Sequence, residues 1–366
     1  MTPPSPSAMA VVTQVLYDTG LASATGIGVG MALLVSPCSA HGILARRLGR
    51  LALPVAALVF ATAVLHHLSA VAAFAKTGLV QALSWQTVSA FITAPPARGS
   101  CLGPGEIAVA QSFFYLLTIG GLIWIRRHPS RSAGIGVAGC AVLTAVLPQL
   151  ISRTLTANAL PSVVLTIAHM VGALLWVGGL IVLATVAVMG RRPAGYSDVR
   201  ENAAALTDEW RRVWERFSVV ALYAVGALII SGTWMTWTHV GTPTQLLTTP
   251  YGRALGLKLI FVALLMAAGA YNVRVLLPRI RAAQRDCDNR TAWKIAVEHF
   301  PAVAICESVI AVAVFAIVPF LRGSARSEAG WPNAGPFDMN AAATGLVLVL
   351  LMAVGLRFGT KVREPL

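Results

Sequence analysis

The feature that most constrains this chain is a series of long apolar stretches that recur along most of its length. A helix needs about 20 apolar residues to cross the hydrocarbon core of a bilayer. The sequence therefore predicts an all-α, polytopic transmembrane bundle of about nine spans. The predicted spans are Met9–Val35, Leu51–Ala75, Glu106–Ile125, Ala133–Ile151, Leu160–Met189, Phe217–Val240, Ala254–Leu277, Ile295–Leu321 and Met339–Leu356.

The composition excludes an ordinary soluble protein of this length. Charged residues make up 11% of the chain, against about 25% in soluble proteins, and hydrophobic residues make up 57%. So few charges cannot cover a water-facing surface. The net charge of +14 does not indicate nucleic-acid binding, because the basic residues form short clusters between the apolar stretches. The lipid bilayer is therefore the expected partner.

The basic clusters also predict the orientation of the bundle. Lys and Arg accumulate in segments on the cytoplasmic side of a membrane. If the N-terminus lies outside, the inner segments hold 21 Lys and Arg residues and the outer segments hold 7. We therefore expect the N-terminus outside and the C-terminus inside. The first span is expected to be a retained helix, because it lacks the basic region that precedes a cleaved signal peptide.

The segments between the spans predict the organisation of the rest of the chain. An outer stretch at 77–105 is expected to lie partly on the membrane surface, and an amphipathic inner stretch at 197–216 is expected to form an interfacial helix. We divide the chain into helices 1–4 (1–158), a core of helices 5–8 (159–322) and an outer loop with a ninth helix (323–366). Neither a large soluble catalytic domain nor an ATP-binding loop is present, so no enzyme activity is predicted. Gly26, Gly28 and Gly30 are expected to serve close helix packing.

Ionisable side chains inside the bilayer are costly, which makes each a functional candidate. The helical rise places several of them at a similar depth in the outer part of the membrane. Imidazole, thioether and carboxylate groups together suit a transition metal, and copper fits this set. The predicted outer metal ligands are His66, His67, His169, Met170, Met235 and His239. Asp18, Glu106 and Lys258 are expected to line the transport path at a similar depth.

Structural alternatives stay open for these residues. Neighbouring helical side chains point about 100° apart, so only one of His66 and His67 is expected to face a given site. His169 is also compatible with a packed seam, His239 with an interface anchor, and the methionines with core packing. Asp18 and Lys258 are compatible with a structural salt bridge.

Glu307 differs from these residues because it falls close to the middle of the eighth span. A carboxylate at that depth must be protonated, paired or part of an ion path. We therefore predict that Glu307 binds the metal or guides its passage. Asn272, Glu298 and His299 lie toward the inner side, where they form either an exit route or the polar boundary of the membrane.

Four motifs in order resemble the copper resistance protein D (CopD) family over residues 160–321. The first is His169-Met-Val-Gly-Ala-Leu-Leu-Trp176-Val-Gly-Gly179, similar to an H-x6-W-x-G-G helix. The others are Arg216-Phe217-Ser218 leading to Ser231-Gly232, then Thr249-Pro-Tyr251-Gly252-Arg253 with Lys258 and Asn272…Pro278, and finally Glu307. The resemblance implies roles for His169, Trp176, Tyr251, Lys258 and Glu307.

The resemblance implies a multi-pass protein of the bacterial plasma membrane that transports copper ions. It also implies a periplasmic copper-binding partner or an oxidase assembly partner. Two alternatives remain open at this point. One is a copper-delivery or cytochrome oxidase assembly factor. The other is an electron-transfer protein in which His66 and His169 ligate a b-type haem.

Overall fold

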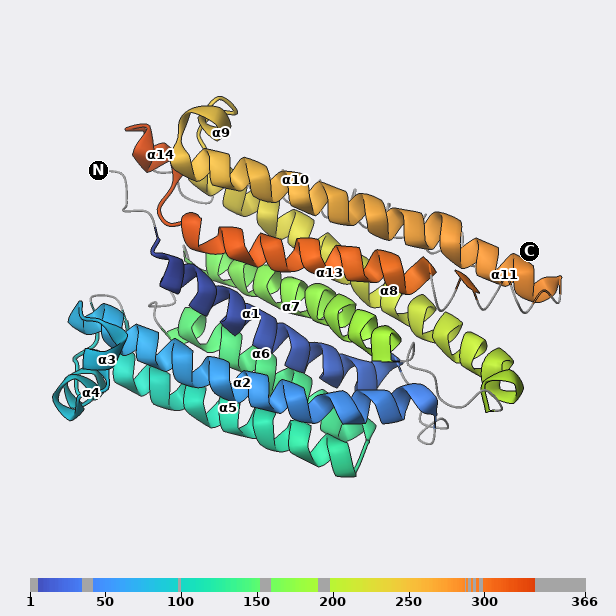
Figure 1. The fold of residues 1–366 in the computed structure, drawn as a ribbon. Helices are drawn as coiled ribbons and strands as arrows, with labels where there is room; N and C mark the ends of the chain where they lie inside the picture. Colours follow the sequence, from blue (N-terminus) through green and yellow to red (C-terminus); the bar gives the residue numbers. More distant parts are fainter. Residues whose placement is uncertain are drawn as a thin grey trace.

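The computed structural model describes residues 6–34, 42–97, 100–151, 159–189, 198–286 and 299–332, together with residues 288, 291, 294 and 295. These residues form a bundle of long helices without a β-strand among them (Figure 1). The long helices are α1 (Ala8–Val29), α2 (Ile43–Ala75), α5 (Pro104–Arg127), α6 (Arg131–Ile151), α7 (Leu160–Met189), α8 (Asp198–His239), α10 (Pro250–Tyr271) and α13 (Phe300–Ile317).

Successive long helices run in opposite directions, so the short elements collect at the ends of the bundle (Figure 1). We call the end where α1 begins the N-terminal end. It carries α3 (Leu79–Ala82), α4 (Trp85–Ile92), α9 (Gln245–Thr248) and α14 (Ala325–Glu328). At the opposite end, α10 continues through a π-helical turn, η3 (Asn272–Leu276), into α11 (Leu277–Arg285).

Seven helices of the described residues are long and apolar enough to cross a membrane, which confirms a helical multi-pass protein. The predicted first span also forms a helix, α1, followed by a π-helical turn, η1 (Gly30–Leu34), but α1 is not among these seven. The predicted ninth span, Met339–Leu356, lies outside the described residues. The division at 158 and 322 remains a prediction.

Helix α1 is the central helix of the bundle, which explains its modest apolarity. Every residue from Gly20 to Val29 is buried, and α1 packs against α2, α6, α7 and α13. A helix surrounded by other helices needs small side chains more than large apolar ones, because its neighbours must approach closely. Its glycines, serines and threonines meet that need.

Glycines allow this close approach, as the sequence predicted for Gly26 and Gly28. A Cβ atom on Gly26 of α1 would overlap the carbonyl group of Gly178 on α7, and a Cβ on Gly178 would overlap the carbonyl of Ala22. A Cβ on Gly28 would lie 2.6 Å from the carbonyl oxygen of Gly134 on α6. The α1–α7 contact is therefore a backbone-to-backbone contact that only glycine permits.

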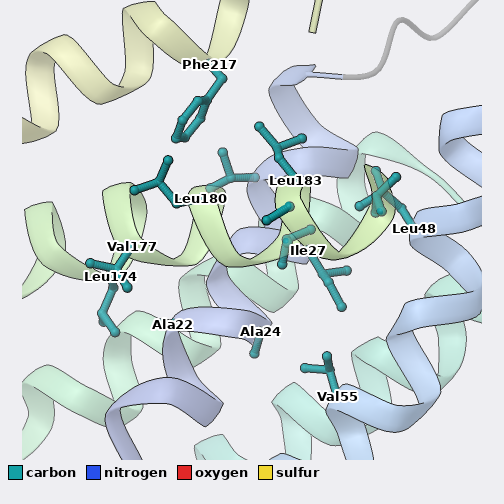
Figure 2. Close-up of a cluster of buried hydrophobic side chains, with 14 of the residues drawn as sticks. Ala22, Ala24, Ile27, Leu48, Val55, Leu174, Val177, Leu180, Leu183 and Phe217 are labelled. Atoms are coloured by element: carbon teal, nitrogen blue, oxygen red, sulfur yellow. The ribbon is translucent and has the colours of Figure 1, made fainter. Parts of the chain in front are cut away.

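The next residue of α7, Gly179, serves a different neighbour. A Cβ atom there would collide with the ring of Phe217, which α8 points toward α7 (Figure 2). Leu180 and Leu183 of α7 lie beside the same ring, and Ile27 lies on the α1 side of α7 (Figure 2). Gly178 and Gly179, which lie shortly after Trp176, thus allow α1 and α8 to pack closely against α7.

The predicted interfacial helix at 197–216 is not a separate helix. It is the first part of α8, which runs unbroken for 42 residues. Its apolar residues Leu206, Trp210, Val213 and Trp214 are buried against the protein core, with the two tryptophan rings stacked 5.4 Å apart. The interfacial assignment was wrong because an apolar stripe at helical spacing has the same pattern whether a membrane or a protein covers it.

We expect Trp210→Ala to destabilise the protein by about 3–5 kcal/mol, as is usual when a fully buried tryptophan is truncated. Thermal unfolding of the purified protein in detergent measures this loss. Trp85→Ala is the matched control, because the Trp85 side chain is 78% exposed and should change stability little. Equal effects of the two substitutions would contradict the packed arrangement of α8.

Candidate functional site

Polar side chains from several helices lie at one level near the N-terminal end of the bundle. His66 lies nine residues before the end of α2, and His169 lies nine residues after the start of α7. Asp18 lies ten residues into α1, and Lys258 lies eight residues into α10. At about 1.5 Å per residue, all four lie about 12–15 Å from the same end. We call these residues and their polar neighbours the polar layer.

One side of the polar layer is built around His66 and His67. The His66 ring stacks on Tyr17 of α1 with ring centres 4.2 Å apart. Tyr115 of α5 meets the Tyr17 ring at 6.5 Å and the His67 ring at 5.7 Å, edge to face in both cases. The His67 Nε2 atom lies 3.1 Å from the Ser112 hydroxyl. The two histidines therefore face different helices, α1 and α5.

The centre of the layer holds an acidic and a basic side chain, Asp18 and Lys258. The Gln14 amide donates to both carboxylate oxygens of Asp18, at 3.1 Å each. Asp18 and Lys258 interact electrostatically between α1 and α10. Asp18 and Lys258 do not form a direct ion pair, so they interact at longer range than a salt bridge. Lys258 also interacts with His169.

The other side of the layer is formed by His169 and Ser231. The His169 Nδ1 atom lies 3.0 Å from the Ser231 hydroxyl, whose proton is donated to the Ala227 carbonyl at 2.6 Å. A serine hydroxyl has one proton, so Ser231 must accept from His169 Nδ1–H. A neutral His169 then carries its free lone pair on Nε2, the atom that a metal can bind.

Two further histidines follow the same rule. Ser112 donates its proton to the Ala108 carbonyl at 2.8 Å, so it accepts from His67 Nε2–H and leaves Nδ1 of His67 free. His239 Nδ1 lies 2.7 Å from the Met235 carbonyl oxygen, which only accepts, so Nε2 of His239 is free. His66 forms no hydrogen bond to a described residue.

These donors do not form one closed metal site in this structure. Among the described residues, no three His, Cys, Asp or Glu side chains lie close enough together to hold a metal ion. Met170 packs against the hydrophobic core, which fits the structural alternative for that residue. The predicted outer ligands are therefore distributed over several positions.

The arrangement does not support the haem alternative. A haem between His66 and His169 would require the two rings to face each other across the macrocycle. Helix α1 packs extensively on both α2 and α7 and lies between them, and its Tyr17 ring covers His66 (Figure 1).

His239 and Tyr251 form a second group closer to the N-terminal end. Their rings are nearly parallel, with centres 5.8 Å apart. The Tyr251 backbone N–H donates to Glu328 of α14 at 2.9 Å, which ties the loop after α13 to the start of α10. Glu328 was not predicted, because nothing in its local sequence indicates that its loop folds back onto α10.

Glu307 of α13 has one polar side-chain partner, which the sequence did not predict. The Asn272 amide of η3 donates to Glu307 Oε1 at 3.3 Å, and the side chains are 5% and 3% exposed. The Asn272 Oδ1 atom has no partner among the described residues. No charged side chain of the described residues interacts with Glu307. A π-helical turn begins at Asn272, and such turns are frequent at functional sites.

The remaining predicted residues lie at the margins or in the core. Glu106 is exposed and accepts the Gly103 backbone N–H at 2.8 Å, so it caps the start of α5. Trp176 is buried in the core of α7. His299 is exposed before the start of α13, and Glu298 lies outside the described residues. Their roles in a transport path remain predictions.

The residues that sequence reasoning missed are the partners of the predicted ones. Gln14, Tyr17, Ser112 and Tyr115 are single polar residues in helices, a pattern that by itself indicates nothing. Gln14 and Asp18 are four residues apart, which places them on one helix face. That spacing is the one local signal that could have found a partner.

Comparisons with known proteins bear on the second half of the chain. Neither the curated proteins nor the solved structures yield a match. A family model does match, over a segment that begins in α8 and ends after α13. That segment includes Ser231, His239, Lys258, Asn272 and Glu307. Residues 211–321 of this membrane protein match the family of copper resistance protein D, CopD.

Proposed function

We propose that this protein moves copper ions across the bacterial plasma membrane, with the N-terminal end of the bundle facing outside. The CopD match supports copper as the substrate. The excess of basic residues in the segments at the opposite end supports the orientation. The match begins within α8 and ends after α13, so a role for α1, α2, α5 and α7 rests on the polar layer alone.

The observation that carries the proposal is the tethering of three histidines by protein oxygens. His67, His169 and His239 each donate one ring N–H to a serine or a carbonyl and keep the other nitrogen free. Metal-binding histidines are oriented in this way by an outer hydrogen-bond partner. Imidazole nitrogen binds copper in either oxidation state, so each of these nitrogens can bind the ion for part of its passage.

A distributed set of donors suits transport better than storage. A conducting protein must bind its ion strongly enough to capture it and weakly enough to release it, which favours several partial sites. Copper would pass from His239 near the surface to the polar layer, and then toward Glu307 and Asn272. These two residues form a buried polar pair between the polar layer and the opposite end.

We further propose that an extracytoplasmic copper-binding protein delivers copper to the N-terminal end. The chain has no Met-rich or His-rich loop that would capture free copper. In this proposal the second protein carries out the capture step, and His239 is the candidate residue to receive the ion.

We expect Ser231→Ala to slow copper movement about tenfold or more, because loss of an outer partner of a metal ligand costs about 10- to 100-fold. The measurement is the rate of copper accumulation in vesicles that contain the purified protein. Thr233→Ala is the matched control. Thr233 lies on the same helix and also donates to a carbonyl of its own helix, at 2.8 Å, but its side chain is exposed.

The vesicle experiment also separates transport from delivery. Copper that binds the protein but does not enter the vesicles would contradict transport and support a delivery or assembly factor. Equal rates for Ser231→Ala and the unaltered protein would contradict the proposed role of His169. A visible spectrum of the purified protein with a haem absorption band would contradict the copper site itself.

A further inference from the structure

A groove lined by arginines lies between α8 and α11, at the end of the bundle opposite the polar layer. Its volume is about 300 Å³, and it is lined by Arg211 of α8 and by Arg281, Gln284 and Arg285 of α11. The groove is open to its surroundings, so a ligand can enter from the side. Among the described residues, its lining contains hydrogen-bond donors from both helices and no carboxylate.

Carboxylates outside the lining fix the two facing arginines. Glu215 Oε1 accepts from Arg211 Nη1 at 3.0 Å and from Arg281 Nη2 at 3.0 Å and Nε at 3.1 Å. Asp208 Oδ1 also accepts from Arg211, at 2.5 and 3.2 Å. Glu215 therefore holds guanidinium groups from two helices side by side, which is the arrangement that a phosphate group needs.

The groove keeps a positive charge after these pairs are formed. Asp208 and Glu215 pair with Arg211, Arg212 and Arg281, and Glu209 also interacts with Arg212, so these three arginines are balanced by carboxylates. Arg285 is exposed and adds a further positive charge at the groove. Asp286 follows Arg285 but does not line the groove. An anion in the groove would meet the guanidinium group of Arg285, which forms no direct ion pair with a described residue.

The position of the groove along the bundle indicates where its anion would come from. Arg211 lies 28 residues before the end of α8 at His239, and Arg281 lies 31 residues after the start of α10 at Pro250. These separations correspond to about 42–46 Å along the helices. A bilayer with its headgroups is about 40–45 Å thick. Exposed Trp237 and Trp331 near the His239 end are typical of one membrane surface, so the groove lies at the headgroup level of the other.

We propose that this groove binds the phosphate of an anionic phospholipid headgroup. Basic pockets between transmembrane helices at the cytoplasmic surface are suited to such headgroups. The Cα–Cβ bonds of α11 tilt toward its N-terminus, which directs Arg281 and Arg285 back toward the bilayer. A bound headgroup would join α8 to α11, which Glu215 already links. This inference does not depend on copper transport.

The test compares lipid binding to the full chain by native mass spectrometry in detergent. Phosphatidylglycerol and phosphatidylcholine are titrated separately, and phosphatidylglycerol is expected to bind about tenfold more tightly or better. The Arg281→Gln/Arg285→Gln variant is expected to lose this preference. The matched control is Arg274→Gln/Arg279→Gln, which removes the same charge from exposed arginines of η3 and α11 that do not line the groove. It is expected to keep the preference.

Several results would overturn the proposal. An equal loss in the control variant would show attraction by net charge alone, and an unchanged preference in the groove variant would show that the lipid binds elsewhere. Inorganic phosphate that binds as tightly as phosphatidylglycerol would identify a free-phosphate site instead. Arg285→Gln alone serves as a second variant if the double substitution impairs folding, because this single change removes no direct ion pair. It is expected to weaken the preference for phosphatidylglycerol severalfold.

Discussion

Glu307→Leu is expected to reduce copper movement to the level of vesicles without protein. The substitution removes the buried carboxylate of α13 and leaves both polar groups of Asn272 without a partner among the described residues. That loss costs about 1–3 kcal/mol of stability, which a large bundle tolerates. Copper flux should therefore fall far more than stability does. Flux into vesicles and thermal unfolding in detergent, measured on the same preparation, separate the two effects.

Glu307→Gln sharpens the same experiment. Glutamine keeps the volume of the side chain and can accept the Asn272 hydrogen bond, but it cannot carry a negative charge. We expect a folded protein with lost transport. Ser308→Ala is the matched control, because the neighbouring hydroxyl donates only to the Ala304 carbonyl of its own helix. Transport at the normal rate by Glu307→Gln would show that the carboxylate has a structural role alone.

Gly178→Val is expected to prevent the bundle from forming in its present arrangement. The new side chain would occupy the position of the Ala22 backbone, so α1 and α7 would have to separate. Because α1 is buried between its neighbours, separation exposes packing along the whole helix. We expect a loss above about 4 kcal/mol, in the range of the most severe single substitutions.

Gly139→Val on α6 is the matched control for this prediction. A Cβ atom at Gly139 meets no atom within 4 Å, and the residue lies in another helix that is long and apolar enough to cross a membrane. The same substitution there should leave the protein folded. Size-exclusion chromatography and thermal unfolding in detergent report both outcomes. A stable Gly178→Val protein would show that α1 and α7 do not pack through their backbones.

The length and spacing of apolar stretches were sufficient to predict most of the helices. The predicted span Leu160–Met189 coincides with α7, and the other described spans differ mainly at their ends. The rise per residue also placed His66, His169 and Lys258 at one level. Depth is a property of position along one helix, so a single sequence contains it.

Contacts between helices could not be predicted in the same way. Asn272 and Glu307 are 35 residues apart, and their meeting depends on how α10 and α13 pack. The tautomer of His169 depends on Ser231 of another helix, and on the hydrogen bond that this serine donates to the Ala227 carbonyl. The burial of Trp210 and Trp214 depends on which surface covers α8. These features arise from the rotation of each helix about its axis, which hydropathy does not encode.

The continuity of α8 has a mechanical consequence. The helix contains no proline and runs from the arginine groove to His239 without interruption, whereas α10 passes through the π-helical turn η3 before it continues as α11. A continuous helix can pass a translation or rotation of one end toward the other. Ser231 and Arg211 therefore lie on one continuous helix, about 30 Å apart along its axis. A displacement of α8 at the arginine groove, near one face of the membrane, would therefore reach Ser231 and change its contact with His169 near the other face.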